Sequence, residues 1–404
     1  MSHISPIAEQ YLRLHVVPGL GAIGFGRLME AFGSIDAVAQ ASVRELAGVE
    51  RISPAMAQRI RDGLNSAEAV REEIALAGRL GVRIICREDP HFPSLLRHVS
   101  DPPAVLYVRG ELLEEDQLAL AVVGMRDPSR YGIEQAASFA QAAAMAGLCV
   151  VSGLARGIDT AAHEAALRVR GRTLAILGCG LVHLYPPEST ELANAITRSG
   201  ALISDFPLNT PPARNTFPVR NRLIAGMSLG TLVIEGTTTS GAMITARLAI
   251  DYGREVFAIP GPVNSRCSEG PNRLIQRGEA AMVLNFSDLL DGLRSAGHQF
   301  AEAPAPPPGP ATPASLFDGP ASPENASSPA QQPARPALPP LVLSTEETVL
   351  LKAMGQGRVD VDSLLDHCEL PIATVMSTLA TLQIKGLIRQ LAGGVFERRR
   401  PGET

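Results

Sequence analysis

The chain has 404 residues, of which 45% are hydrophobic and 19% charged, and its formal net charge at pH 7 is −5. At roughly 150 residues per domain, this length predicts two or three globular domains. The acidic balance excludes a broad basic surface for nucleic acid, and no uncharged apolar run is long enough to span a membrane. We therefore expect no membrane attachment and, for any nucleic acid, a narrow binding site.

The five cysteines are scattered, and no two of them have the Cys-x-x-Cys spacing of zinc sites and redox motifs. This pattern predicts no metal site and no disulfide framework, and it favours a cytoplasmic protein. Positive charge comes almost entirely from arginine, since Lys352 and Lys385 are the only lysines. Arginine is suited to bidentate contacts with phosphate.

Residues 1–75 are predicted to form a helical domain, because short helical segments are separated by Gly and Pro. Residues 19–24 match the dinucleotide-binding pattern GxGxxG, but Pro18 precedes them and the upstream segment is helical. A helix-hairpin-helix or SAM-like turn fits this context better, either as a phosphate contact or as a plain turn. The predicted helices are Ile7–Val17, Gly24–Ala31, Ser34–Ala41, Val43–Leu46 and Pro54–Leu64.

Residues 76–297 alternate apolar, β-rich runs with helical patterns, which is typical of a parallel sheet with crossover helices. Several of these runs are apolar throughout, as expected of strands covered on both faces. We therefore predict an α/β fold with a Rossmann-like parallel sheet as its core. The predicted strands are Ala104–Arg109, Leu118–Val123, Leu148–Ser152, Arg172–Leu177, Ala201–Ser204, Gly230–Val233, Glu255–Ala258 and Ala281–Leu284.

The remainder of the chain divides into a linker and a third domain. Residues 298–342 are rich in Pro, Ala and Ser and poor in large apolar side chains, which predicts a flexible linker. Residues 343–404 resume a helical pattern, with helices expected at Thr345–Met354, Asp362–His367 and Ile372–Lys385 and a β-like tail at Leu387–Glu397. This arrangement predicts a winged-helix domain. Its third helix has no basic residue before Lys385, so the domain is expected to bind protein, or duplex DNA only weakly.

Two predicted strands end in loops that combine glycine with arginine. Glycine allows a backbone to approach a ligand closely, and the helix that follows each loop offers free N–H groups to an anion. Either loop alone could be an ordinary strand–helix turn with a surface arginine. The candidate binding residues in the two loops are Gly124, Arg126, Ser152, Gly153, Arg156 and Gly157, with Asp159 as a helix cap or a partner of an arginine.

Three further strand ends carry similar side chains. The segment Phe217–Arg222 holds Arg220, Asn221 and Arg222, and a later segment holds Ser240 and Gly241 after three threonines. The last strand end carries Pro260-Gly261, with Gly270-Pro271-Asn272 further on. Hydroxyl and guanidinium groups are common donors to phosphate oxygens. The carboxyl ends of parallel strands meet at one edge of a sheet, so these groups are predicted to hold an extended polyanion there.

The sequence contains few groups for catalysis. There is no P-loop and no Ser–His–Asp arrangement, and His163 and His183 are the only histidines of residues 100–292. His163 is expected to be a packing or capping residue of a helix. We therefore predict a binding protein without enzymatic activity, metal or cofactor.

These motifs, in this order, resemble the DNA-processing protein A (DprA, or Smf) family. The resemblance covers most of residues 90–290 and includes Gly178–Leu181, Tyr185-Pro186 and Pro260-Gly261 besides the loops above. It implies binding of single-stranded DNA, a homodimer, and help in loading the recombinase RecA during natural transformation. It also implies DNA contacts for the residues of these loops that match the family's motifs, which are Arg126, Ser152, Gly153, Arg156, Gly157, Arg220, Asn221 and Arg222.

Two positions depart from the family pattern. Met125 stands where the family usually has Ser, which removes one possible hydrogen bond to phosphate. Arg214 stands where relatives often have a lysine, and we expect it to take that residue's phosphate contact.

A nucleotide-processing enzyme of the phosphoribohydrolase type is the alternative, because such enzymes share glycine-rich strand ends. It would need a Pro-Gly-Gly-x-Gly-Thr loop with a nearby Glu. The nearest match, Leu229-Gly230-Thr231 with Glu235, lacks the run of glycines.

Overall fold

The structure is a computed structural model that describes residues 4–293, 343–355, 358–368, 370–385, 387–391 and 395–398. The first domain is helical as predicted, and serine side chains cap four of its helices by accepting from the backbone of the first turn. A sixth helix, α6, was missed by the sequence analysis. The helices are α1 (Pro6–His15), α2 (Ala22–Phe32), α3 (Ile35–Gln40), α4 (Val43–Ala47), α5 (Pro54–Asn65) and α6 (Glu68–Leu80).

The predicted boundary between residues 75 and 76 falls inside α6, which is stopped at Leu80 by Gly81 in the left-handed conformation. A domain cannot be divided in the middle of a packed helix without exposing its buried face, which includes Val70 and Ala77. We propose that the division between the first two domains lies at Gly81.

The central domain is built on a nine-stranded sheet in the order β1-β2-β6-β5-β4-β3-β7-β8-β9. Neighbouring strands from β6 to β9 are parallel, whereas β1 and β2 pair antiparallel at one edge. The eight predicted strands are all present, and β1 is the one that was missed. The strands are β1 (Val82–Cys86), β2 (Val105–Gly110), β3 (Ala119–Val123), β4 (Cys149–Ser152), β5 (Thr173–Ile176), β6 (Ala201–Ser204), β7 (Gly230–Val233), β8 (Glu255–Ala258) and β9 (Ala281–Met282).

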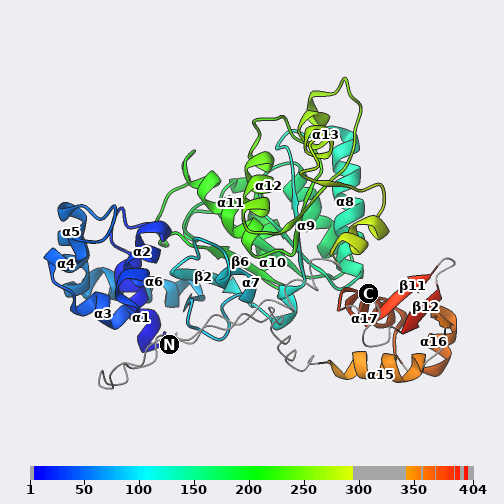
Figure 1. The fold of residues 1–404 in the computed structure, drawn as a ribbon, viewed down its shortest axis with the longest axis horizontal. Helices are drawn as coiled ribbons and strands as arrows, with labels where there is room; N and C mark the ends of the chain where they lie inside the picture. The colour runs from blue at the N-terminus through cyan, green and yellow to red at the C-terminus, as the bar shows by residue number, and fades with distance from the viewer. Residues whose placement is uncertain are drawn as a thin grey trace, which may run out of the picture.

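Helices lie on both faces of this sheet, with α11 and α12 on one side and α8 and α9 on the other (Figure 1). Strands β3, β4, β5 and β7 are buried at every position, which explains why most of their residues are apolar. The covering elements are α7 (Ser94–Arg97), η1 (Glu114–Gln117), α8 (Arg130–Met145), α9 (Ile158–Arg168), η2 (Pro187–Ser189), α10 (Thr190–Ile196), α11 (Thr216–Gly226), α12 (Gly241–Asp251), η3 (Arg266–Ser268) and α13 (Glu269–Gln276). This is the predicted Rossmann-like arrangement.

The strand order reverses between β3 and β7. Strands β3 to β6 run outward in one direction, and β7 to β9 run outward in the other. Val123 pairs with Val233 at the carboxyl ends of β3 and β7, so the loops that follow these strands are neighbours. Open α/β sheets bind ligands in the crevice at such a reversal.

The C-terminal domain has the predicted winged-helix form, with α15 (Thr345–Met354), β10 (Arg358–Asp360), α16 (Val361–His367), α17 (Ile372–Ile384), β11 (Ile388–Leu391) and β12 (Val395–Arg398). Its own core includes Leu350, Leu379 and Phe396. The predicted linker, 298–342, lies outside the described residues. Of the helices that the structure describes, none combines the length and the apolar character needed to cross a bilayer.

His163 of α9 is fully buried, as expected of a packing residue. Its Nδ1 lies 2.7 Å from the hydroxyl of Thr173, which donates to Val150 O, so Nδ1 carries a proton, whereas Nε2 is buried without a hydrogen-bond partner. Burial lowers the pKa of His163 from its ordinary value of 6.5 to about 3, with a smaller contribution from Arg220.

Protonation of His163 therefore favours unfolding. Its folded pKa lies below its unfolded pKa, so stability is lost as the pH falls below 6.5. We expect the free energy of unfolding to fall by about 2 kcal/mol more in the parent protein than in His163→Asn between pH 6.5 and pH 5. Urea unfolding at both pH values measures this difference, and equal pH dependence would contradict a neutral buried imidazole.

Candidate nucleic-acid interface

A cavity of about 780 Å³ opens at the carboxyl edge of the sheet, beside the β3–β7 reversal. A smaller cavity of about 30 Å³ adjoins it, and the two share part of their walls. The larger volume is in the range of small-molecule sites. The residues that line both are Arg126, Ala155, Tyr185, Phe217 and Arg220.

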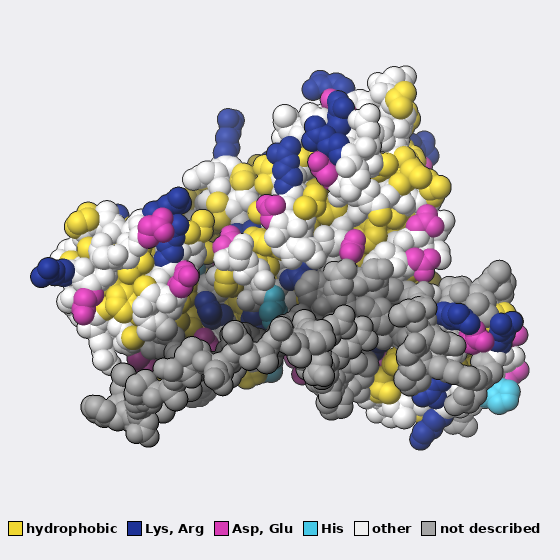
Figure 2. All heavy atoms as spheres, viewed as in Figure 1, with side chains coloured by type: hydrophobic (Ala, Val, Ile, Leu, Met, Phe, Trp, Pro, Cys, Tyr) yellow, Lys and Arg dark blue, Asp and Glu magenta, His cyan; other side chains and the backbone are white. Residues whose placement is uncertain are grey.

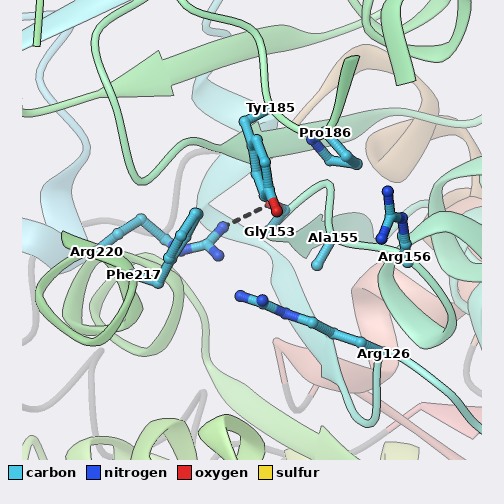
Figure 3. A pocket seen from close by; sticks show the side chains of 8 residues that line it. All are labelled: Arg126, Gly153, Ala155, Arg156, Tyr185, Pro186, Phe217 and Arg220. Carbon is cyan, nitrogen blue, oxygen red and sulfur yellow. Dashed lines mark hydrogen bonds between the residues drawn. The ribbon is translucent and has the colours of Figure 1, made fainter. Parts of the chain in front are cut away.

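Nine of the twelve predicted binding residues line these cavities. The loops after β3 and β4 and the helix α11 contribute Arg126, Gly153, Arg156 and Arg220 (Figure 3). The loop before α11 and the start of α12 contribute as well. Four of the five arginines that were expected there, Arg126, Arg156, Arg214 and Arg220, line the cavities, and Arg222 does not. The nine residues are Gly124, Arg126, Gly153, Arg156, Arg214, Arg220, Asn221, Ser240 and Gly241.

The other three face the protein interior. Ser152 is fully buried and donates its hydroxyl to Val122 O at 2.7 Å. Gly157 begins α9 with a φ of +77° in close packing against the backbone of Met125. Arg222 is buried and forms an ion pair with Asp205. These residues shape and support the edge loops rather than line the cavities.

Arg126 extends into the cavity from the loop after β3 (Figure 3). Its guanidinium carbon lies 4.9 Å from the centre of the Phe217 ring, which is a cation–π contact. Within the part of the chain that the structure describes, no carboxylate forms an ion pair with Arg126. Its charge is therefore available to an anion.

Arg220 forms the floor of the site and is only 4% exposed. Its Nη1 donates to Gly153 O at 2.7 Å and to Ile176 O, so it ties together the ends of β4 and β5. Burial lowers the pKa of Arg220 to about 10, Asp159 opposes this shift, and the nearby charge of Arg126 adds to it. Nε of Arg220 has no hydrogen-bond partner. Two neighbouring guanidinium groups, one of them buried, favour the entry of an anion.

Arg156 stands at the outer rim and has an exposed side chain. It pairs with Glu188, and this partner raises the pKa of Arg156 and lowers the pKa of Glu188. An exposed ion pair of this kind is weak, because solvent screens it. Arg156 can therefore exchange Glu188 for a phosphate at small cost.

Part of the backbone of the loop after β4 is already hydrogen-bonded within the protein. The carboxylate of Asp159 accepts from Gly153 N at 3.1 Å and from Ala155 N at 3.3 Å. Burial raises the pKa of Asp159, whereas Arg220 and the two backbone N–H groups lower it. These two N–H groups are therefore not free for an anion, because a buried carboxylate already uses them. The anion-binding groups that remain are side chains.

Two aromatic residues form a wall that the sequence analysis did not assign to the site. The rings of Tyr185 and Phe217 lie 5.5 Å apart, and both line the cavity next to Arg220. Aromatic rings beside guanidinium groups are the usual means of stacking unpaired bases while holding a backbone. In the sequence, each of these aromatic residues directly precedes a proline of a motif already singled out, and this was the signal that could have assigned them to the site.

The N-terminus of α12 closes the far side of the larger cavity. No side chain caps this helix, and Ser240 Oγ has no hydrogen-bond partner. Asn221 donates to Gly241 O at 3.3 Å and holds the helix start against α11. The positive end of the helix dipole adds to the field of the arginines.

The site has the donors of an anion-binding pocket and few groups for chemistry. The described residues that line the two cavities include no histidine and no cysteine. Across the described ranges, no cluster of three His, Cys, Asp or Glu residues could hold a metal ion. The fold and the site thus define a Rossmann-like protein with an arginine-lined pocket at the strand reversal.

Comparison with known proteins identifies the family. Residues 83–294 match the family model for DNA recombination-mediator protein A, and residues 329–394 match the DprA winged helix domain. Protein Smf of Escherichia coli (strain K12) is 36% identical over 319 residues, which are 78% of each chain. DNA processing protein DprA of Bacillus subtilis (strain 168) is 36% identical over 223 residues, 55% of this chain and 75% of the relative.

A solved structure agrees with this result. The X-ray structure of DNA processing protein A from Streptococcus pneumoniae superposes with a TM-score of 0.61 at 30% identity, covering 72% of this chain and 98% of the other. The chain belongs to the DprA/Smf family, as the resemblance of its motifs indicated.

Gly153 tests the packing of the site. A Cβ atom at this position would overlap the guanidinium of Arg220. We expect Gly153→Ala to lower the free energy of unfolding by about 1–3 kcal/mol, as overpacking of an interior does. Gly26→Ala is the matched control, because a Cβ atom there meets nothing within 4 Å on helix α2. Denaturant unfolding of both variants decides the point, and equal stabilities would contradict the close packing.

Proposed function

We propose that the protein binds single-stranded DNA in the cavity at the carboxyl edge of the sheet and acts on incoming DNA during natural transformation. The observation that carries this proposal is the convergence of Arg126, Arg156 and Arg220 on one cavity. The relatives named DNA processing protein and DNA recombination-mediator protein A support it.

Single-stranded DNA fits the site better than duplex DNA for two reasons. Tyr185 and Phe217 can stack only on bases that are unpaired. Duplex binding without sequence contacts needs a wide basic surface, whereas Figure 2 shows acidic and basic side chains mixed over the visible face. Arginines gather at the cavity, whereas the chain as a whole has a negative net charge. We therefore expect the affinity for DNA to be confined to the pocket.

We propose that the protein has no enzymatic activity. The alternative, a phosphoribohydrolase, would use Glu235 as its acid or base. Glu235 is 2% exposed, and both of its carboxylate oxygens accept from Ser129. Incubation with nucleoside monophosphates should therefore release no free base.

We propose three further properties of this chain, which concern its partner, its location and its winged-helix domain. We propose RecA as partner, which the recombination-mediator name of the matching family supports. We propose a cytoplasmic location, which five free cysteines, four of them buried, support. We propose that the winged helix does not read duplex DNA, since Lys385 at the end of α17 pairs with Glu347.

A homodimer is also proposed. Strand β9 is an edge of the sheet, and Met282 and Leu284 there are 51% and 66% exposed. Apolar side chains on an open edge favour pairing with another chain.

The arginine site predicts the effect of removing one charge. We expect Arg126→Ala and Arg156→Ala each to weaken binding of an oligo-dT by about 1–3 kcal/mol. Each should also reduce the slope of log K against log salt by about 0.7, because one phosphate contact is lost. Fluorescence anisotropy at several salt concentrations measures both quantities.

Arg277→Ala is the control for charge alone, since Arg277 is exposed, ends α13 and pairs with Glu279 outside the cavities. It should leave the affinity nearly unchanged. Affinity and salt slope at parent values in both site variants would refute the proposed site.

The exposed edge predicts the effect of a charge just after β9, which ends at Met282. Leu284→Arg should convert the dimer to a monomer, because a guanidinium would be forced into an apolar contact. Ile23→Arg, at a residue 61% exposed on α2, should leave the dimer intact. Light scattering after size exclusion measures the masses, and a persistent Leu284→Arg dimer would place the interface elsewhere.

A further inference from the structure

We infer that Glu235 is a positioning residue for Arg126, a role that rests on the proposed function. Glu235 follows β7, and the loop that carries Arg126 follows the neighbouring strand β3. The two loops are joined at their start, where Ile234 N donates to Val123 O at 3.0 Å. The strand pairing thus places a buried carboxylate beside the loop of residues 124–129.

Both oxygens of this carboxylate hold one residue of that loop. Ser129 N donates to Oε2 of Glu235 at 2.8 Å, and Ser129 Oγ donates to Oε1 at 2.5 Å. Ser129 Oγ also accepts from Gly132 N at 3.1 Å and so caps α8. The carboxylate of Glu235 and the hydroxyl of Ser129 therefore fix both the end of the Arg126 loop and the start of α8.

The sequence of α8 is adapted to this contact. A Cβ atom on Gly132 would overlap the carboxylate of Glu235, so the helix can approach only with glycine at that position. Tyr131 adds a second attachment, because its hydroxyl donates to Pro260 O at 3.1 Å. Burial and the charge of Glu235 raise the pKa of Tyr131, which keeps its hydroxyl a donor.

The other end of the loop is fixed as well. Met125 O accepts from Ile158 N at 3.2 Å at the start of α9. Three residues, 126–128, remain between the two attachments, and of these Arg126 has its side chain over Phe217 in the cavity. Glu235 does not line either cavity, so it acts on a ligand only through the loop. With Glu235 removed, Arg126 would lose its fixed orientation.

The test combines a mutant cycle with hydrogen exchange on the full chain. Glu235→Ala should weaken binding of oligo-dT by at least about fivefold, and the Glu235→Ala/Arg126→Ala double variant should bind no more weakly than Arg126→Ala alone. Backbone exchange in residues 124–132 should rise in Glu235→Ala. Glu235→Gln, which can still accept from Ser129 N, should recover part of the affinity, and Ser129→Ala should lose part of it.

Asp116→Asn is the matched control. Asp116 is also a buried carboxylate, 7% exposed, but it binds Arg172 and Leu113 N at the opposite edge of the sheet. It should leave both DNA affinity and exchange in residues 124–132 unchanged. Affinity losses of Glu235→Ala and Arg126→Ala that multiply, or unchanged exchange, would overturn the inference. If Arg126→Ala and Arg156→Ala both bind DNA as the parent does, the proposed function fails, and the exchange result alone then decides whether Glu235 holds the loop.

Discussion

A buried guanidinium at the ends of parallel strands is the constraint on which the site depends. Arg220 donates to backbone oxygens after β4 and β5, and the carboxylate of Asp159 lies close enough to offset part of its charge. A buried charge is tolerated only when it is hydrogen-bonded or paired. Asp159 in turn binds the backbone of the β4 loop. The loop shape and the charge of the pocket floor therefore stabilise each other.

The sheet topology decides which groups join this centre. The reversal between β3 and β7 brings together the Arg126 loop, the Glu235 loop and the start of α12. The Arg126 loop presents a positive charge, the start of α12 presents Ser240, and the Glu235 loop supports the Arg126 loop from behind. Tyr185 and Phe217 add flat apolar surfaces. A flexible chain of phosphates and unpaired bases matches such a surface, whereas a rigid duplex would reach only its rim.

The sequence predicted the strands and the loops that meet at the edge, because buried parallel strands are apolar throughout and their ends carry Gly and Arg. It did not predict the directions of side chains. Arg220 and Arg222 are two residues apart on α11, and such residues face opposite sides of a helix. Arg222 accordingly lies against Asp205. The contact between Asp159 and Gly153 N also depends on the tertiary path of the β4 loop, which spacing along the chain does not determine. Helix α6 was missed although Val70, Ile74 and Ala77 have helical spacing, because its many charged residues obscured the pattern.

The most direct test of the account is the structure of the full chain bound to a short oligo-dT. The account predicts phosphate oxygens within hydrogen-bond distance of Arg126 and Arg156 and an unpaired base against the Tyr185–Phe217 wall. DNA bound on another face of the central domain, with the cavity beside β3 and β7 left empty, would contradict it.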